Sequence, residues 1–176
     1  MVKRTSSILI SKASKTKVKT ISVRKTPNKK KFLTRETKKA KTKSHTVKKI
    51  NKTRRILMNE ARKARKNSYS PYSKFRVGAA LMTHEGKIFS GCNVENVSYG
   101  LSNCAERTAV FKSVSEGYKK ISSMAITSSG KDPTFPCGGC RQVMAEFNPE
   151  MKVYIDGDDK EYLISELLTH SFKEIS

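Results

Sequence analysis

The spacing of apolar residues predicts that ordered structure begins close to residue 51. Asn51 or Thr53 can cap a helix, and apolar residues follow at helical spacing. We expect Pro71 to break this helix, because proline lacks the amide hydrogen that a continuing turn needs. The predicted apolar stripe consists of Ile56, Leu57, Ala61 and Ala64.

Short apolar runs after this helix predict a hairpin and then a series of strands and helices. The hairpin strands are expected at 76–83 and 87–92, with a turn at 84–86. The small residues Gly78-Ala79-Ala80 would let another element pack closely against the first strand. The remaining predicted elements are a helix over 104–116 ended by Gly117, a strand over 121–127, a helix over 137–147, strands over 151–155 and 161–164, and a helix over 165–168. This order predicts an α/β fold layered around a mixed sheet.

Charge divides the chain into two parts. Residues 1–55 contain 21 Lys and Arg against one acid, whereas residues 56–176 contain 16 against 14 acids. Residues 1–50 have no sustained period of 2 or 3.6, and such a polar stretch buries too little surface to offset its ordering entropy. We therefore predict a basic, disordered extension over 1–50 and one folded domain over 51–176.

The basic extension is compatible with three roles. It is either a solvated extension, a segment that contacts nucleic-acid phosphates through residues 1–55, or an import signal for an organelle. Because Phe32 is the only aromatic residue in that stretch, nucleic-acid binding should be nonspecific.

The sequence predicts neither a membrane span nor an export signal, since no window approaches about 20 apolar residues. We therefore expect a cytoplasmic protein in a reducing compartment. Four cysteines in a secreted chain would suggest two disulfides. Here, however, the pair Cys137-Gly138-Gly139-Cys140 has the spacing of metal ligands.

Three cysteines lie where two predicted helices begin. Cys137 and Cys140 start one helix, and Cys104 starts another. The partial positive charge of a helix N-terminus favours thiolates, which bind zinc, and three protein ligands leave a fourth position for water. The alternatives are a redox Cys-x-x-Cys pair, or a closed structural site whose fourth ligand is Cys92, His45, His84 or His170.

Glu106 favours a catalytic site over a structural one. It follows the ligand Cys104 by two residues, so its carboxylate can reach water at the metal without binding the metal. A ligand-x-Glu sequence followed by Pro136-Cys137-Gly138-Gly139-Cys140 is the pattern of zinc deaminases. The alternative is a solvated Glu in the first turn of a helix, where it favours the helix dipole.

Several motifs together are specific to one family. They are Pro71-Tyr72-Ser73-Lys74-Phe75, Val77-Gly78-Ala79-Ala80-Leu81, Gly91-Cys92-Asn93-Val94-Glu95-Asn96, Cys104-Ala105-Glu106-Arg107-Thr108-Ala109, Pro136-Cys137-Gly138-Gly139-Cys140-Arg141-Gln142-Val143 and Glu166-Leu167-Leu168. With them, the chain from Leu57 to Phe172 resembles the homotetrameric cytidine deaminases of the cytidine/deoxycytidylate deaminase superfamily. The resemblance implies a three-layer α/β sandwich with a mixed central sheet flanked by helices. Residues 1–55 have no counterpart in it.

The resemblance also implies a role for each matching residue. Glu106 would shuttle protons, Asn93 and Glu95 would bind the ribose hydroxyls, Phe75 would pack on the pyrimidine, and the backbone of Ala105 would touch the pyrimidine edge. The implied Zn²⁺ ligands are Cys104, Cys137 and Cys140. For Phe75, plain core packing is the alternative.

Other implied roles concern charge and assembly. Three thiolates leave the zinc site with a net negative charge, and Arg107 would withdraw charge by donating to two of the sulfurs. Tyr99 and Phe172 would reach a neighbouring subunit's pocket, which implies a homo-oligomer, most simply a tetramer.

The implied reaction is hydrolytic deamination of free cytidine and deoxycytidine to uridine and deoxyuridine, with release of ammonia, as in pyrimidine salvage. A blasticidin-type deaminase is one alternative, although we expect it to lack the ribose-binding pair Asn93 and Glu95. A nucleic-acid-editing deaminase is another, although such enzymes usually carry His where Cys104 stands. A non-enzymatic basic protein with a zinc knuckle is the third.

Overall fold

The computed structural model describes residues 52–172, so the predictions for 1–51 and 173–176 lie outside the described part of the chain. Within the described residues, five strands form one sheet in the order β2-β1-β3-β4-β5. Their bounds are Val77–Thr83 (β1), Ile88–Cys92 (β2), Ile121–Ser128 (β3), Lys152–Ile155 (β4) and Glu161–Leu163 (β5). The pair β3–β4 is parallel and the other pairs are antiparallel, which confirms the predicted mixed sheet.

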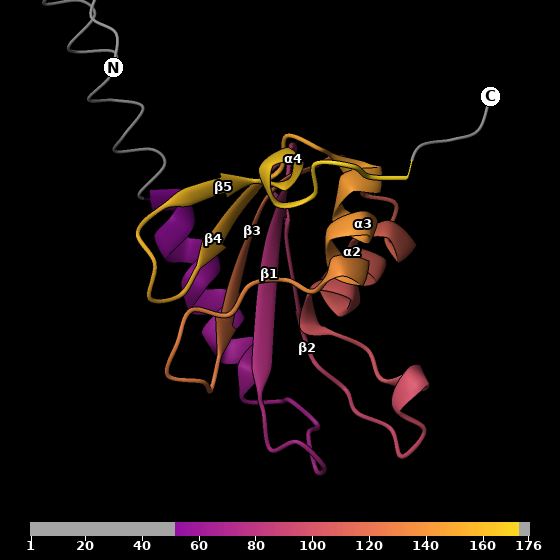
Figure 1. Cartoon of the computed structure of the whole chain (residues 1–176). Coiled ribbons are helices and arrows are strands. Elements are labelled where there is room, and N and C mark those ends of the chain that lie inside the picture. Colours follow the sequence, from indigo (N-terminus) through magenta and orange to yellow (C-terminus); the bar gives the residue numbers. More distant parts are fainter. Residues whose placement is uncertain (1–51, 173–176) are drawn as a thin grey trace, which may run out of the picture. The chain divides into compact units, whose positions relative to one another are not determined.

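Helices cover both faces of this sheet. The first helix, residues 52–65, packs on one face, and α2 and α3 pack on the other (Figure 1). The bounds of the remaining helices are Ala105–Ser115 (α2), Gly138–Phe147 (α3), Ile164–Leu167 (α4) and a 3₁₀ turn at Tyr99–Leu101 (η1) that was not predicted. The predicted three-layer α/β sandwich is therefore confirmed. No helix in residues 52–172 is long and apolar enough to cross a bilayer.

Alternation along β1 explains why both faces are covered. Ala80 belongs to the cluster on the first helix, whereas Ala79 and Leu81 belong to the cluster under α2 and α3. Successive side chains of a strand point to opposite faces, so a strand with apolar residues at consecutive positions needs a helix on each side. The first helix buries Leu57 and Ala61 as predicted, together with Met58.

Two glycines let the helices approach the sheet closely. A Cβ on Gly78 would clash with the carbonyl oxygen of Ala61 in the first helix. A Cβ on Gly91 would lie 2.6 Å from the amide nitrogen of Ala109 in α2. The prediction of close packing at Gly78 is confirmed, and Gly91 plays the same part for α2.

The prediction that Pro71 ends the first helix is wrong. The helix ends at residue 65, and the chain is then held by hydrogen bonds to a distant segment. The amide of Tyr69 donates to the carbonyl of Asn93 (3.1 Å), and the amide of Glu95 donates to the carbonyl of Tyr69 (2.8 Å). These bonds require an extended backbone at Tyr69, so the helix must stop before it.

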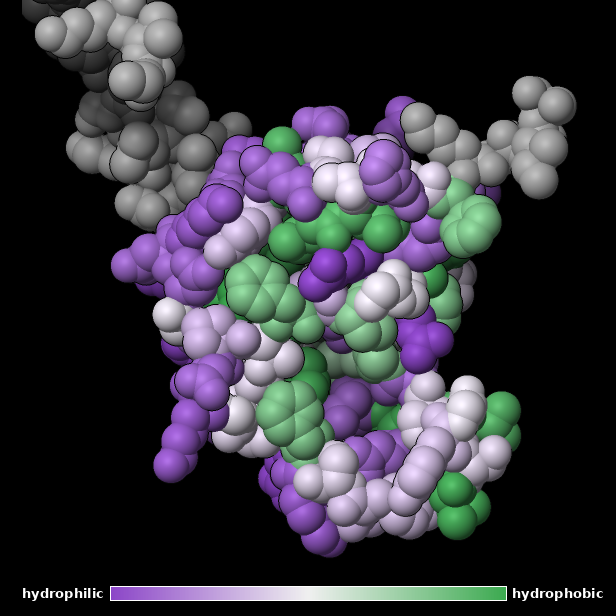
Figure 2. All heavy atoms as spheres, viewed as in Figure 1, coloured by the Kyte–Doolittle hydropathy of each residue, from purple (hydrophilic) through white to green (hydrophobic). Residues whose placement is uncertain are grey.

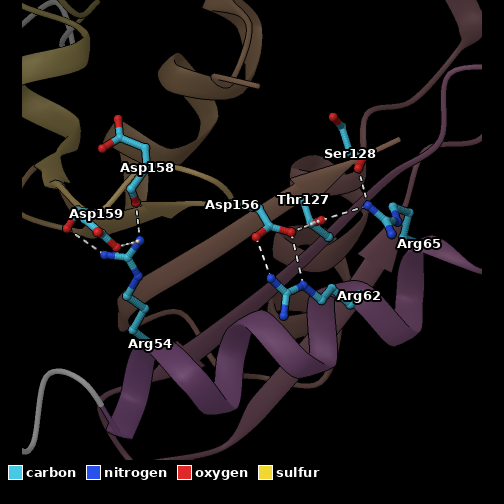
Figure 3. Close-up of polar contacts among 8 residues, drawn as sticks. All are labelled: Arg54, Arg62, Arg65, Thr127, Ser128, Asp156, Asp158 and Asp159. Atoms are coloured by element: carbon cyan, nitrogen blue, oxygen red, sulfur yellow. Dashed lines mark hydrogen bonds and ion pairs between the residues drawn. The ribbon is translucent and has the colours of Figure 1, made fainter. Parts of the chain in front are cut away.

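Three arginines of the first helix bind oxygens at the ends of β3 and β4 and in the loop after β4 (Figure 3). Arg54 donates to the carbonyls of Asp158 and Asp159, the latter at 2.7 Å. Arg62 binds both carboxylate oxygens of Asp156, at 3.1 and 2.6 Å. Arg65 donates to the hydroxyl of Thr127 (3.1 Å) and to the carbonyl of Ser128. These contacts fix the first helix on its face of the sheet.

Candidate active site

The N-termini of α2 and α3 bring three sulfurs together. Cys104 is the N-cap residue of α2, Cys137 is the N-cap residue of α3, and Cys140 lies in the first turn of α3. Their sulfur atoms all lie within 4.8 Å of one another, and those of Cys104 and Cys137 are 4.0 Å apart. In residues 52–172 no fourth cysteine and no histidine joins this group, so the closed structural site is not formed there. His45, the remaining candidate for a fourth ligand, lies outside the described residues.

The sulfur group fits a zinc ion. Tetrahedral Zn²⁺ with Zn–S distances of about 2.3 Å places its sulfurs about 3.8 Å apart, close to the separation found here. Hydrogen bonds from the Cys140 thiol and from Arg107 lower the pKa of the Cys104 thiol to about 5. Donating that hydrogen bond, together with burial, raises the pKa of Cys140. A divalent cation among the sulfurs would hold all three as thiolates.

Arg107 supplies positive charge beside the sulfurs. Its Nη2 lies 3.9 Å from the sulfur of Cys104 and also donates to the carbonyl of Ser102 at 3.2 Å. The resemblance implied donation to two sulfurs, and the structure has it to one. The buried Nε of Arg107 has no hydrogen-bond partner among the described residues, so its N–H is available to a further acceptor.

Glu106 is buried beside the sulfurs, with only 5% of its surface exposed. Burial raises the pKa of its carboxyl, and the nearby Cys104 adds to this effect. A carboxyl that is easily protonated suits a group that takes up and releases protons near neutral pH. The alternative of a solvated helix residue is therefore wrong, because Glu106 is withdrawn from solvent.

A pocket of about 320 Å³ connects two of the three cysteines with most of the predicted substrate-binding residues. The predicted residues that line it are Phe75, Asn93, Glu95, Cys104, Ala105, Glu106 and Cys137. Figure 2 shows hydrophobic side chains beside a hollow between the η1 loop and the rest of the domain. Glu106, Cys104 and Cys137 therefore open into the same cavity as the predicted sugar-binding residues Asn93 and Glu95.

Asn93 and Glu95 are held in place by hydrogen bonds within the chain. Both residues follow β2, which ends at Cys92. The side-chain oxygen of Asn93 accepts from Ser68 (2.6 Å) and from the amide of Val77 (2.8 Å), and its Nδ2 donates to the carbonyl of Phe75 (2.8 Å). One N–H of Asn93 therefore stays available to a ligand.

The Glu95 carboxylate accepts from the Ser73 hydroxyl and from the amides of Tyr72 (2.9 Å) and Ser73 (3.2 Å). These hydrogen bonds, that from the Ser73 hydroxyl most of all, lower the pKa of Glu95. A carboxylate has about four acceptor positions, so an ionised Glu95 can accept a further hydrogen bond from a ligand hydroxyl.

Tyr99 and Phe172 do not line the pocket of their own chain. Tyr99 is 75% exposed and packs edge-on against Tyr72, with ring centroids 6.1 Å apart. Phe172 is 88% exposed, and its backbone is bound by the side chain of Gln142 at 2.9 and 3.1 Å.

Phe135 and Thr134 line the pocket without having been predicted. The ring of Phe135 packs edge-on against Tyr162, with centroids 5.2 Å apart. The only signal in the sequence was its position directly before the motif that begins at Pro136.

Comparisons with known proteins agree with this site. A family model for the cytidine and deoxycytidylate deaminase zinc-binding region matches residues 51–156. A cytidine deaminase of Halalkalibacterium halodurans is 51% identical over 109 residues, which cover 60% of this chain and 83% of the relative. A probable cytidine deaminase of Dictyostelium discoideum is 58% identical over 81 residues, which cover 46% of this chain and 55% of the relative.

Solved structures show the same fold. The cytidine deaminase of Burkholderia pseudomallei matches with a TM-score of 0.64 and 45% identity, over 67% of this chain and 98% of that one. The cytidine deaminase of Mycobacterium tuberculosis matches with a TM-score of 0.63 and 36% identity, over 68% and 97%. The chain is a zinc-dependent hydrolase. It belongs to the cytidine and deoxycytidylate deaminase family.

Proposed function

We propose that this enzyme deaminates free cytidine and deoxycytidine to uridine and deoxyuridine, with release of ammonia, in pyrimidine salvage. The observation that carries the proposal is the single pocket that joins Glu106 and the cysteine sulfurs to Asn93 and Glu95. Glu106 and the sulfurs suit an attack by water, and Asn93 and Glu95 suit the binding of two neighbouring sugar hydroxyls. Thiolate ligands must stay reduced, so we expect the enzyme to work in a reducing compartment such as the cytoplasm.

The charges of the pocket favour a nucleoside over a nucleotide. Among the described residues that line it there is no Lys or Arg, whereas Glu95 and Glu106 both contribute carboxyl groups. A phosphate at the sugar would have no cation to pair with and would lie near an ionised Glu95. Cytidylate and polynucleotides should therefore be poor substrates.

In the proposed reaction, a bound zinc ion supplies the Lewis acidity that activates a water molecule for attack on C4 of the pyrimidine. Glu106 accepts a proton from that water and passes it to N3. Glu106 then takes the remaining proton from the new C4 hydroxyl and delivers it to the amino nitrogen. The C4–N4 bond breaks, the C4–O bond becomes the carbonyl of the product, and ammonia leaves. Phe75 and Phe135 flank the ring, and the available N–H of Asn93 and the Glu95 carboxylate orient the sugar.

We further propose that the active species is an oligomer, most simply a tetramer. Tyr99 and Phe172 support this, because both aromatic rings are exposed and neither lines its own pocket. An exposed aromatic ring near the chain end can close the pocket of a neighbouring subunit instead.

Steady-state assays with cytidine, deoxycytidine, cytidylate and single-stranded DNA test the proposal. We expect turnover of both nucleosides, with little turnover of cytidylate and none of the polymer. Turnover of the polymer without turnover of the nucleosides would contradict it.

A further inference from the structure

The outward face of the first helix is almost entirely cationic. The exposed positions of this helix and of the residue that follows it recur at helical spacing. They are Lys52, Arg55, Asn59, Arg62, Lys63 and Lys66, and we call them the basic stripe. Five of the six carry positive charge, whereas an ordinary solvated helix face mixes both signs.

Only part of this charge is used within the domain. Arg62 pairs with Asp156 at 2.6 Å, and Lys63 pairs with Glu60 at 2.7 Å. Lys52, Arg55 and Lys66 have no ion pair and no side-chain hydrogen bond to any residue in 52–172. The anchoring of the helix to the sheet therefore does not depend on these three side chains, because Arg54, Arg62 and Arg65 provide it (Figure 3).

Lys52 and Arg55 lie within one turn of each other in the described part of the helix. Arg54, between them, has an acidic partner in Asp159, 3.7 Å away. Lys52 and Arg55 have no acid within ion-pair distance in residues 52–172, so their charge is available for a contact outside the described domain.

We infer that the basic stripe binds the phosphate backbone of nucleic acid. From Lys52 to Lys66 it extends about 21 Å at 1.5 Å per residue. That length faces about six phosphates of one strand, at 3.4 Å each. The stripe directly continues residues 1–51, which contain 18 Lys and Arg against one acid, so the positive charge of the sequence runs unbroken into the ordered domain.

An anionic membrane is a less suitable partner. A helix that lies in a membrane surface needs apolar side chains that can enter the lipid. In the first helix the residues Leu57, Met58 and Ala61 are buried against the sheet, and the stripe itself has none.

The test uses the full chain and a fluorescently labelled 24-base-pair DNA duplex. The triple variant Lys52→Gln, Arg55→Gln, Lys66→Gln removes the three unpaired cations and leaves Arg62 and Lys63 in their ion pairs. The matched control, Lys87→Gln, Lys112→Gln, Lys119→Gln, removes three exposed cations that lie elsewhere. Binding is measured across a range of salt concentrations.

Each lost phosphate contact lowers the slope of log K against log salt by about 0.9. The slope for the stripe variant should therefore be smaller in magnitude than that of the wild type by about 2 to 3, and the control should have the wild-type slope. A loss of less than about 1.5, or an equal loss in the control, would overturn the inference. So would unchanged DNA binding in a variant that no longer binds phosphatidylserine vesicles. Cytidine turnover, which should be the same in all three proteins, tests the proposed function separately.

Discussion

On the face of the sheet under the first helix, three arginines are bound by oxygens of the same domain, whereas on the face under α2 and α3 the polar groups open into a pocket. Arg62 and Asp156 satisfy each other across the first face. On the second, Glu106 and the sulfurs are gathered at one cavity, and the cation Arg107 lies beside the sulfur of Cys104. Polar groups that hold this fold are paired within the chain, and those that do chemistry are left for a metal and a substrate.

The largest expected effect is that of Glu106→Gln on the pocket side. The amide keeps the size of the side chain but cannot move protons, so turnover of cytidine should fall by at least ~10²-fold while the zinc content stays unchanged. Kinetics and metal analysis on the same preparation measure both. Glu116→Gln, at the exposed end of α2, is the matched control and should have normal turnover. Near-normal turnover in Glu106→Gln would show that Glu106 does not carry the chemistry assigned to the face under α2 and α3.

Gly78→Ala and Gly91→Ala compare the two faces directly. Each new methyl group would meet the backbone of a helix, so both variants should lose about 1–3 kcal/mol of stability to overpacking. Only Gly91 lies against α2, the helix that carries Cys104 and Glu106. Urea unfolding should therefore show two destabilised proteins, and zinc titration should show weaker binding in Gly91→Ala alone. Equal zinc affinity in both would indicate that α2 can shift without disturbing the site.

Phe172→Ala tests whether the pocket is completed by another subunit. Loss of a buried aromatic contact in the oligomer should raise KM for cytidine by roughly tenfold, with zinc content unchanged. Kinetics and light scattering check the two parts of this prediction. A fully active monomer, or a variant with the KM of the wild type, would show that the pocket works without a neighbour.

Asp156→Asn should have the smallest effect on stability. It removes the carboxylate that pairs with Arg62 on the face of the sheet under the first helix. Hydrogen bonds from Arg62 lower the pKa of Asp156, so the pair stabilises the folded state above the unfolded pKa of about 3.9. That contribution is lost as the pH falls through the lower folded pKa. Because Arg62 is half exposed, the variant should lose about 0.5–1 kcal/mol at pH 7.

Urea unfolding at several pH values measures the difference between wild type and Asp156→Asn. Any acid-induced loss of metal affects both proteins equally, so the difference reports the pair. It should shrink toward zero below the folded pKa of Asp156. A difference that stays constant with pH would show that the charge on Asp156 does not contribute.

The order of helices and strands could be predicted because its signals are local. Gly117, for example, follows α2 with a positive φ of 90°, a conformation that glycine adopts without strain. The end of the first helix could not be predicted, because it depends on hydrogen bonds between Tyr69 and a segment that begins at Asn93. Such a pairing has no signal within either segment.

The chemical centre was more predictable than the pocket around it. Cys104, Cys137 and Cys140 follow from spacing and from the starts of two helices, and Glu106 follows from its offset to Cys104. Phe135 could not be found in this way, because it lies in an irregular segment between β3 and α3 with no periodicity to place it. Asn93 and Glu95 came from the family resemblance, and their hydrogen bonds within the chain were not foreseeable.

The most direct test of the account is zinc content measured together with cytidine turnover in the wild type, Cys137→Ala and Cys92→Ala. Cys92 lies outside the sulfur group and is the matched control. We predict about one zinc ion per chain and normal turnover in the wild type and Cys92→Ala, and loss of both in Cys137→Ala. Full turnover in metal-free protein, or in Cys137→Ala, would contradict the account.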